Sequence, residues 1–339
     1  MQGHNGCNEF QEASIRKPWA MLLLEKRCPG VWYGNVQHVA GLMVFFVALP
    51  GQSFFFGTLT PHLTKELGIS KEIVSLYFFL AFGSAAIWLQ FVGRLIDKHG
   101  TRRLVMAAIV PFVCAIWGIA TSWNPWLSGF CYVMLRITGQ ETIAFAMTIA
   151  VNRWFVKKRA RAASSLALAI GAQMQITAGI TFLMTAIGWR FTVAGAGCIT
   201  LGVTCAALPL LCDTPEQVGL GPDGAMSKQL PPSPSADTIE DSRAKECEVD
   251  FTRQQAMCTV QFWYMIAMGA AIGLSWGGIN VHLWAYCQDK MLSSSTPGII
   301  YVFIGLGVPS GAVFMGTCSQ CLECYVVLSF ALVYSRWPL

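Results

Sequence analysis

Charged side chains are scarce in this chain of 339 residues: they make up 12% of it, about half the share found in a typical soluble domain. So few charges cannot cover a surface that faces water. The charges are also segregated, because long stretches such as 73–93, 104–135 and 162–189 contain no Asp, Glu, Lys or Arg. Several stretches exceed the roughly 20 residues that cross a bilayer as a helix. The sequence therefore predicts an all-α polytopic membrane protein in contact with the lipid bilayer.

Residue sets that carry out chemistry are missing as well. The sequence has no phosphate-binding loop, no nucleophile with a neighbouring base, and no paired acids of the glycosidase type. Cys318, Cys321 and Cys324 lie three residues apart, but no fourth ligand is near them, so buried cysteines are expected there in preference to a metal site. The sequence thus predicts no enzyme activity, no cofactor and no metal.

The net charge of +5 does not indicate nucleic-acid binding, because the basic residues cluster at the ends of apolar stretches. If the N-terminus is cytoplasmic, seventeen Lys and Arg residues fall on the cytoplasmic side and four on the other side. The positive-inside rule describes this bias. We therefore expect a cytoplasmic N-terminus.

The apolar stretches predict eight complete membrane spans and an incomplete ninth. Between the sixth and the seventh lies a polar segment rich in Pro and Ser, which is predicted to be a flexible linker. The expected organisation is a cytoplasmic segment 1–35, a six-helix bundle 36–212, a linker 213–256 and an incomplete second bundle 257–339. The spans are expected at about 36–60, 73–92, 104–121, 127–150, 162–187, 191–211, 258–284, 297–316 and 324–335.

A short cationic loop, G-R-L-I-D-K-H-G-T-R-R, joins the second and third predicted spans. Gly93 and Gly100 permit close helix packing and a tight turn, and Asp97 is placed to cap a neighbouring helix. The pattern resembles the loop signature of the major facilitator superfamily of transporters. That resemblance implies the two-bundle fold of the superfamily and a gating role for Gly93, Asp97, Gly100, Arg102 and Arg103.

The resemblance implies that the loop aspartate contacts the eleventh helix, which we expect to be missing here because the predicted spans number fewer than eleven. Asp97 is therefore expected to pair with Arg102 or Arg103, or with a partner chain.

Further segments are similar to the monocarboxylate-transporter-like branch of the superfamily: Pro50–Ser53, Arg136–Gln140, Asn152–Arg159 and Asp213–Gly224. The resemblance implies a secondary active transporter of a small organic anion in the plasma membrane, working by alternating access, with protons as a plausible coupling ion. The alternative follows from the short second bundle. A truncated paralogue would not transport, and would act as a membrane partner or regulator.

Arg136 is the one basic residue deep inside an apolar span, where an unpaired charge costs at least about 2.5 kcal/mol. On an α-helix Glu141 would lie about 140° around the axis from Arg136, so the two are not expected to face each other, whereas Gln140 shares the face of Arg136. We expect Arg136 to line a central cavity and attract the anion, with Gln140 bonded to it. Glu141 would take a proton or pair with another helix. The alternative role for Arg136 is helix packing.

Pro50 and Gly51 remove a backbone donor and loosen the first span near its middle. A broken helix can expose carbonyl groups to a cavity. Gln52 follows this pair directly and, with Asn280 in the seventh span, completes the predicted substrate-binding set. For these residues, and for Gln173 in the fifth span, hydrogen bonding between helices is the alternative.

Overall fold

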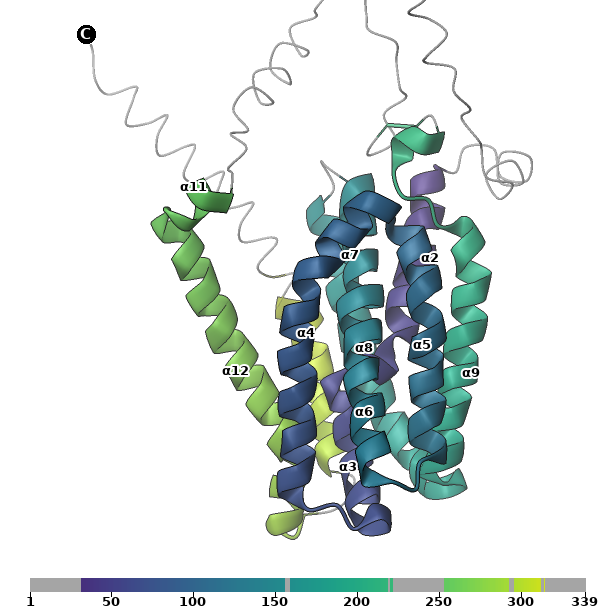
Figure 1. Cartoon of the computed structure of the whole chain (residues 1–339), viewed down its shortest axis with the longest axis vertical. Coiled ribbons are helices and arrows are strands. Elements are labelled where there is room, and N and C mark those ends of the chain that lie inside the picture. Colours follow the sequence, from purple (N-terminus) through teal and green to yellow (C-terminus); the bar gives the residue numbers. More distant parts are fainter. Residues whose placement is uncertain are drawn as a thin grey trace, which may run out of the picture.

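The computed structural model describes residues 32–155, 159–218, 220–221, 253–292, 296–311 and 314, except for the side chains of 159–161, 253, 280, 281, 284, 285 and 288. Four long helices form the frame of an upright bundle: α4 (Lys71–His99), α5 (Thr101–Thr121), α8 (Arg159–Ile187) and α9 (Trp189–Ala207) (Figure 1). Each is long and apolar enough to cross a membrane.

The first and fourth predicted spans are interrupted by turns that are not α-helical. The first consists of α2 (Tyr33–Val47), the 3₁₀ turn η1 (Leu49–Gly51) and α3 (Ser53–Leu67). The fourth consists of α6 (Pro125–Leu135), the π-helix η2 (Arg136–Ala144) and α7 (Phe145–Trp154). The break in the first span falls at Pro50 and Gly51, as their missing donor and conformational freedom predict.

After α9 the chain forms two short turns, η3 (Leu208–Leu210) and η4 (Pro215–Val218), and further on α11 (Arg253–Met257) and α12 (Val260–Asp289). Helix α12 is a further candidate span and packs against α3. The N-terminal end of α12, next to α11, slants away from the bundle (Figure 1). Next comes an apolar helix, Thr296–Gly311. The predicted span at 324–335 and the three spaced cysteines lie outside the described residues.

Helix Thr296–Gly311 packs on α8 through small residues. A methyl group added at Gly305 would lie 2.6 Å from the carbonyl oxygen of Gly171, so the two backbones nearly touch. Tyr301 of the same helix is fully buried, with its ring 6.0 Å from that of Phe54. Small residues at helix crossings allow this close approach inside a membrane.

Aromatic side chains fill the centre of the bundle and also cover its outside. Phe56 of α3 stacks on Tyr132 of α6 with ring centroids 3.5 Å apart, and both side chains are fully buried. In contrast, Phe79, Trp126 and Phe191 are largely exposed. Because a soluble surface would not carry so many large apolar groups, this outer surface fits contact with lipid.

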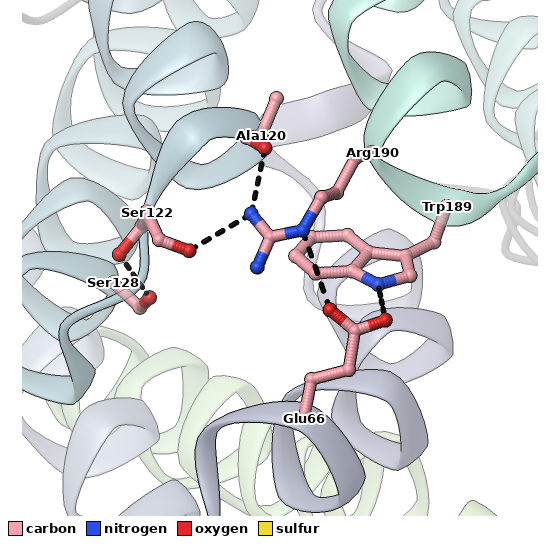
Figure 2. Close-up of polar contacts among 6 residues, drawn as sticks. All are labelled: Glu66, Ala120, Ser122, Ser128, Trp189 and Arg190. Atoms are coloured by element: carbon pink, nitrogen blue, oxygen red, sulfur yellow. Dashed lines mark hydrogen bonds and ion pairs between the residues drawn. The ribbon is translucent and has the colours of Figure 1, made fainter.

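One end of the bundle is held together by Arg190, in the first turn of α9 (Figure 2). Its guanidinium donates to the carbonyl oxygens of Ala120 and Ser122, at 2.9 and 2.8 Å, and to the carboxylate of Glu66 at 3.3 Å. The ring nitrogen of Trp189 donates to the same carboxylate at 2.7 Å. These bonds join the ends of α3, α5 and α9, so we refer to Glu66, Trp189 and Arg190 as the Arg190 cluster.

Candidate functional site

The π-helix η2 lies in the middle of the fourth span and carries the one deeply placed arginine of the sequence. Four of its nine residues are β-branched and one is glycine, a composition that weakens an α-helix. Its hydrogen bonding follows the i to i+5 spacing of a π-helix, and the hydroxyl of Thr142 also donates to the carbonyl of Ile137, five residues back, at 2.8 Å. The ring nitrogen of Trp88 on α4 donates to the same hydroxyl at 2.9 Å.

The π-helical register brings Arg136 and Glu141 together. Their side chains form an ion pair with Nη2 and Oε1 3.2 Å apart, and they are only 12% and 15% exposed. The sequence-based prediction that these two residues do not face each other is therefore wrong. It assumed 100° per residue, whereas the wider turn of the π-helix rotates each residue less and brings position 141 closer to the face of Arg136. The Arg136 guanidinium also lies 4.4 Å from the ring centroid of Phe82, a cation–π contact.

Gln140 does not bond to Arg136 in this arrangement. The Oε1 atom of Gln140 is buried without a hydrogen-bond partner among the described residues, so its predicted bond to Arg136 is not formed. The Nε atom of Arg136 and the hydroxyl of Tyr132 are likewise buried and unpartnered within the described part of the chain. Leaving such a group unsatisfied costs about 1–3 kcal/mol. Two donors and one acceptor in this part of the fourth span thus have no hydrogen-bond partner among the described residues.

The break in the first span packs directly against η2. A methyl group added at Gly51 would lie 2.9 Å from the carbonyl oxygen of Leu135 and 3.0 Å from the backbone nitrogen of Gln140. Only glycine permits this approach, which places the two interrupted segments side by side. Irregular backbone at this depth requires such burial within protein.

The carbonyl groups at the end of α2 accept hydrogen bonds from side chains of other helices. The Gln173 amide on α8 donates to Phe45 and Phe46, at 3.0 and 2.9 Å, and Thr200 on α9 donates to Val47 at 2.9 Å. Gln173 thus forms hydrogen bonds between helices, the role given above as the alternative to substrate binding.

The two remaining predicted binding residues lie differently. Gln52 is buried, and its amide nitrogen is 3.5 Å from the Gln173 side-chain oxygen, so it joins the break in the first span to α8. The backbone of Asn280 belongs to α12, but its side chain lies outside the described part of the structure.

At the end of the bundle opposite the Arg190 cluster, the chain reverses between α4 and α5 at Gly100, whose φ of 82° favours glycine. The carboxylate of Asp213, which follows η3, accepts from the Thr101 hydroxyl at 2.6 Å and from the Arg102 backbone nitrogen at 2.8 Å. It occupies the space that a side chain at position 100 would need. The helix-capping role predicted for Asp97 at this loop therefore belongs to Asp213.

Asp97 itself pairs with Arg153 at the end of α7, with Oδ1 and Nη2 2.8 Å apart. The expected pairing with Arg102 or Arg103 is wrong, because α4 continues through Asp97 to His99 and the chain turns only at Gly100. The Nε atom of Arg102 is buried without a partner in the described structure.

Gly93 does not make the close helix contact expected of it. Open space surrounds the position where its methyl group would lie, as far as the described residues extend.

A family model described as Major Facilitator Superfamily matches residues 41–333, which is most of the chain. The chain belongs to this superfamily. It is therefore an integral, multi-pass membrane protein of a transporter family, with the all-α fold that the composition predicts. A search of curated proteins finds no match.

This member of the major facilitator superfamily combines a broken first span with a π-helical fourth span, and the structure places both interruptions in contact. Sequence reasoning missed Asp213 and Thr200, which act through partners more than 100 residues away. The position of Asp213 directly after the last apolar residues of the bundle is the one local signal that could have indicated a cap. Among the described residues, no cluster of three potential metal ligands is found.

Proposed function

We propose that this protein is a secondary active transporter of a small, monocarboxylate-like organic anion, and that the Arg136–Glu141 pair forms the anion-binding element. The pair is buried in an apolar span, where charges are rare and usually serve transport. The arginine keeps one donor, Nε, unpartnered among the described residues, while Glu141 occupies another part of the guanidinium. This half-satisfied guanidinium is the observation on which the proposal rests.

The chemistry follows from competition for one guanidinium. A carboxylate substrate and Glu141 are both anions, so both cannot bind Arg136 at full strength while ionised. Protonation of Glu141 removes its charge and frees Arg136 for the substrate anion. A proton and an anion would then move together, which is electroneutral symport. The nearby hydroxyl of Tyr132 and the amide oxygen of Gln140 offer one donor and one acceptor for the rest of a small polar anion.

The test is uptake by the full chain in proteoliposomes, with labelled short-chain carboxylates supplied at pH 6 and pH 8. We expect uptake to be faster at the acidic external pH, and a neutral analogue of the same size to be excluded. The double variant Arg136→Gln/Glu141→Gln removes both charges and leaves neither one buried and unpaired. It should remain folded and lose uptake at least about tenfold, the effect of a charged hydrogen bond worth roughly 1.5 kcal/mol.

Lys65→Gln serves as the matched control, because Lys65 is an exposed cation in the last turn of α3. Undiminished uptake by the folded double variant would remove Arg136 from the proposed site. Absence of uptake across the panel by the unmodified chain would favour a non-transporting membrane partner. Accessibility of a terminal tag in intact cells tests the proposed plasma-membrane location with a cytoplasmic N-terminus.

A further inference from the structure

A cavity of about 540 Å³ opens where α4 and α7 end and α5 begins, beside the segment that follows η3. Ligand sites commonly have volumes between roughly 300 and 1,000 Å³. This cavity lies at the end of the bundle opposite the Arg190 cluster and is distinct from the buried Arg136–Glu141 pair. Its charged lining consists of Asp97, Lys98, Arg102, Arg103, Arg153 and Asp213, together with His99.

The two acids of the lining are already engaged. Asp97 is paired with Arg153, and Asp213 accepts two hydrogen bonds at the N-terminus of α5. Lys98, Arg102 and Arg103 have no ion pair with a described residue, and Arg102 has a buried, unpartnered Nε atom. The cavity therefore holds a surplus of positive charge that its own acids do not neutralise.

We propose that this cavity, centred on Lys98, Arg102 and Arg103, binds a phosphate-bearing anion. A phosphate group matches the cavity because it carries up to two negative charges and several strong acceptor oxygens, which guanidinium groups bind well. Basic cavities beside the ends of membrane helices are well placed to hold anionic lipid headgroups. A soluble phosphate ester has the same chemistry, so the two sources are distinguished by experiment.

The purified full chain in detergent is titrated with dioctanoyl phosphatidic acid, and binding is followed by native mass spectrometry. Glycerol 3-phosphate is the soluble arm, and dioctanoyl phosphatidylcholine is the zwitterionic reference. In the variant Lys98→Gln/Arg103→Gln both replaced side chains are exposed, so the fold should persist. Each lost cation is worth about fivefold in affinity, so the pair should weaken binding of phosphatidic acid about 25-fold.

The matched control, Lys65→Gln/Lys290→Gln, removes the same number of exposed cations away from the cavity and should change affinity less than about twofold. The single variant Arg102→Gln, in preparations that are folded, should also weaken binding of phosphatidic acid. Binding of the lipid alone identifies a headgroup site, and equal competition by glycerol 3-phosphate identifies a site for soluble phosphate esters. The proposal is overturned if phosphatidylcholine binds as tightly, if neither phosphate probe binds, or if the control pair weakens binding equally.

Discussion

Exchanging residues 140 and 141 tests the π-helical register of η2 without changing composition or net charge. The variant Gln140→Glu/Glu141→Gln moves the carboxylate from five to four residues after Arg136. On an α-helix this exchange would bring the charges onto one face and form an ion pair. In the structure the side-chain oxygen at position 140 has no hydrogen-bond partner among the described residues and does not accept from Arg136, so the exchange should break the pair that joins Arg136 and Glu141 at 3.2 Å.

The size of the loss follows from burial. Both side chains of the native pair are less than one-sixth exposed, at 12% and 15%. Separating the partners of a buried pair costs about 3–5 kcal/mol, mostly because each charge is left without compensation. Since the pair is not completely buried, we expect the lower end of this range, about 3 kcal/mol. For a bundle of this size that corresponds to a fall in the melting temperature of about 6–12 °C.

The assay is thermal unfolding in detergent, followed by the fluorescence of the 12 tryptophans. The neutral variant Arg136→Gln/Glu141→Gln provides the reference, because replacing a whole buried pair costs far less than breaking it. We expect the exchange variant to melt well below this reference. If it melts at the native temperature, the carboxylate reaches Arg136 from position 140 and the π-helical reasoning is refuted.

Three further substitutions test the packing of the fold, each by its melting temperature or by cross-linking. Gly100→Ala should destabilise the protein by about 2 kcal/mol or more, because position 100 has a positive φ and is crowded by the carboxylate of Asp213. The control Gly93→Ala, where the new methyl group meets open space, should be neutral or slightly stabilising. Arg190→Lys should lower stability by about 2 kcal/mol, because an ammonium cannot reproduce the three bonds of the guanidinium to two carbonyl oxygens and a carboxylate. Native stability of this variant would contradict the role of Arg190 in holding the helix ends together. Gly305→Ala should loosen helix Thr296–Gly311 from α8, at a cost of about 1–3 kcal/mol in stability, and should reduce cross-linking between a cysteine introduced into each of the two helices. Gly307→Ala, in the same background, should cross-link like the chain with glycine at that position.

Hydropathy was sufficient to locate the helices. The helices α5, α8, α9 and α12 match the ends of predicted spans to within five residues, and α4 continues seven residues beyond its predicted span, to His99. Hydropathy succeeds because burial in lipid imposes one local requirement, about 20 consecutive apolar residues. Backbone chemistry was sufficient for the break at Pro50 and Gly51, since the missing donor is a property of proline itself.

The candidate site was predicted less completely. Arg136 stands out in any apolar sequence, but its partner depended on the helical register, and the assumption of an α-helix excluded Glu141 and favoured Gln140. A π-helix inside a span leaves no trace in hydropathy, because one extra residue per turn does not change composition. The register is instead associated here with β-branched residues and with the contact of Gly51 against Gln140.

By itself, then, the sequence determined the class of molecule, the positions of its helices and the residue whose burial demands a partner, because each depends on residue type and short-range spacing. The tertiary structure decided which groups meet: Glu141 with Arg136, Arg153 with Asp97, and Asp213 with the start of α5. These pairings depend on backbone register and on residues brought together from distant parts of the chain. For the two long-range pairings, free energy is gained only when the helices pack together, so no local pattern encodes them.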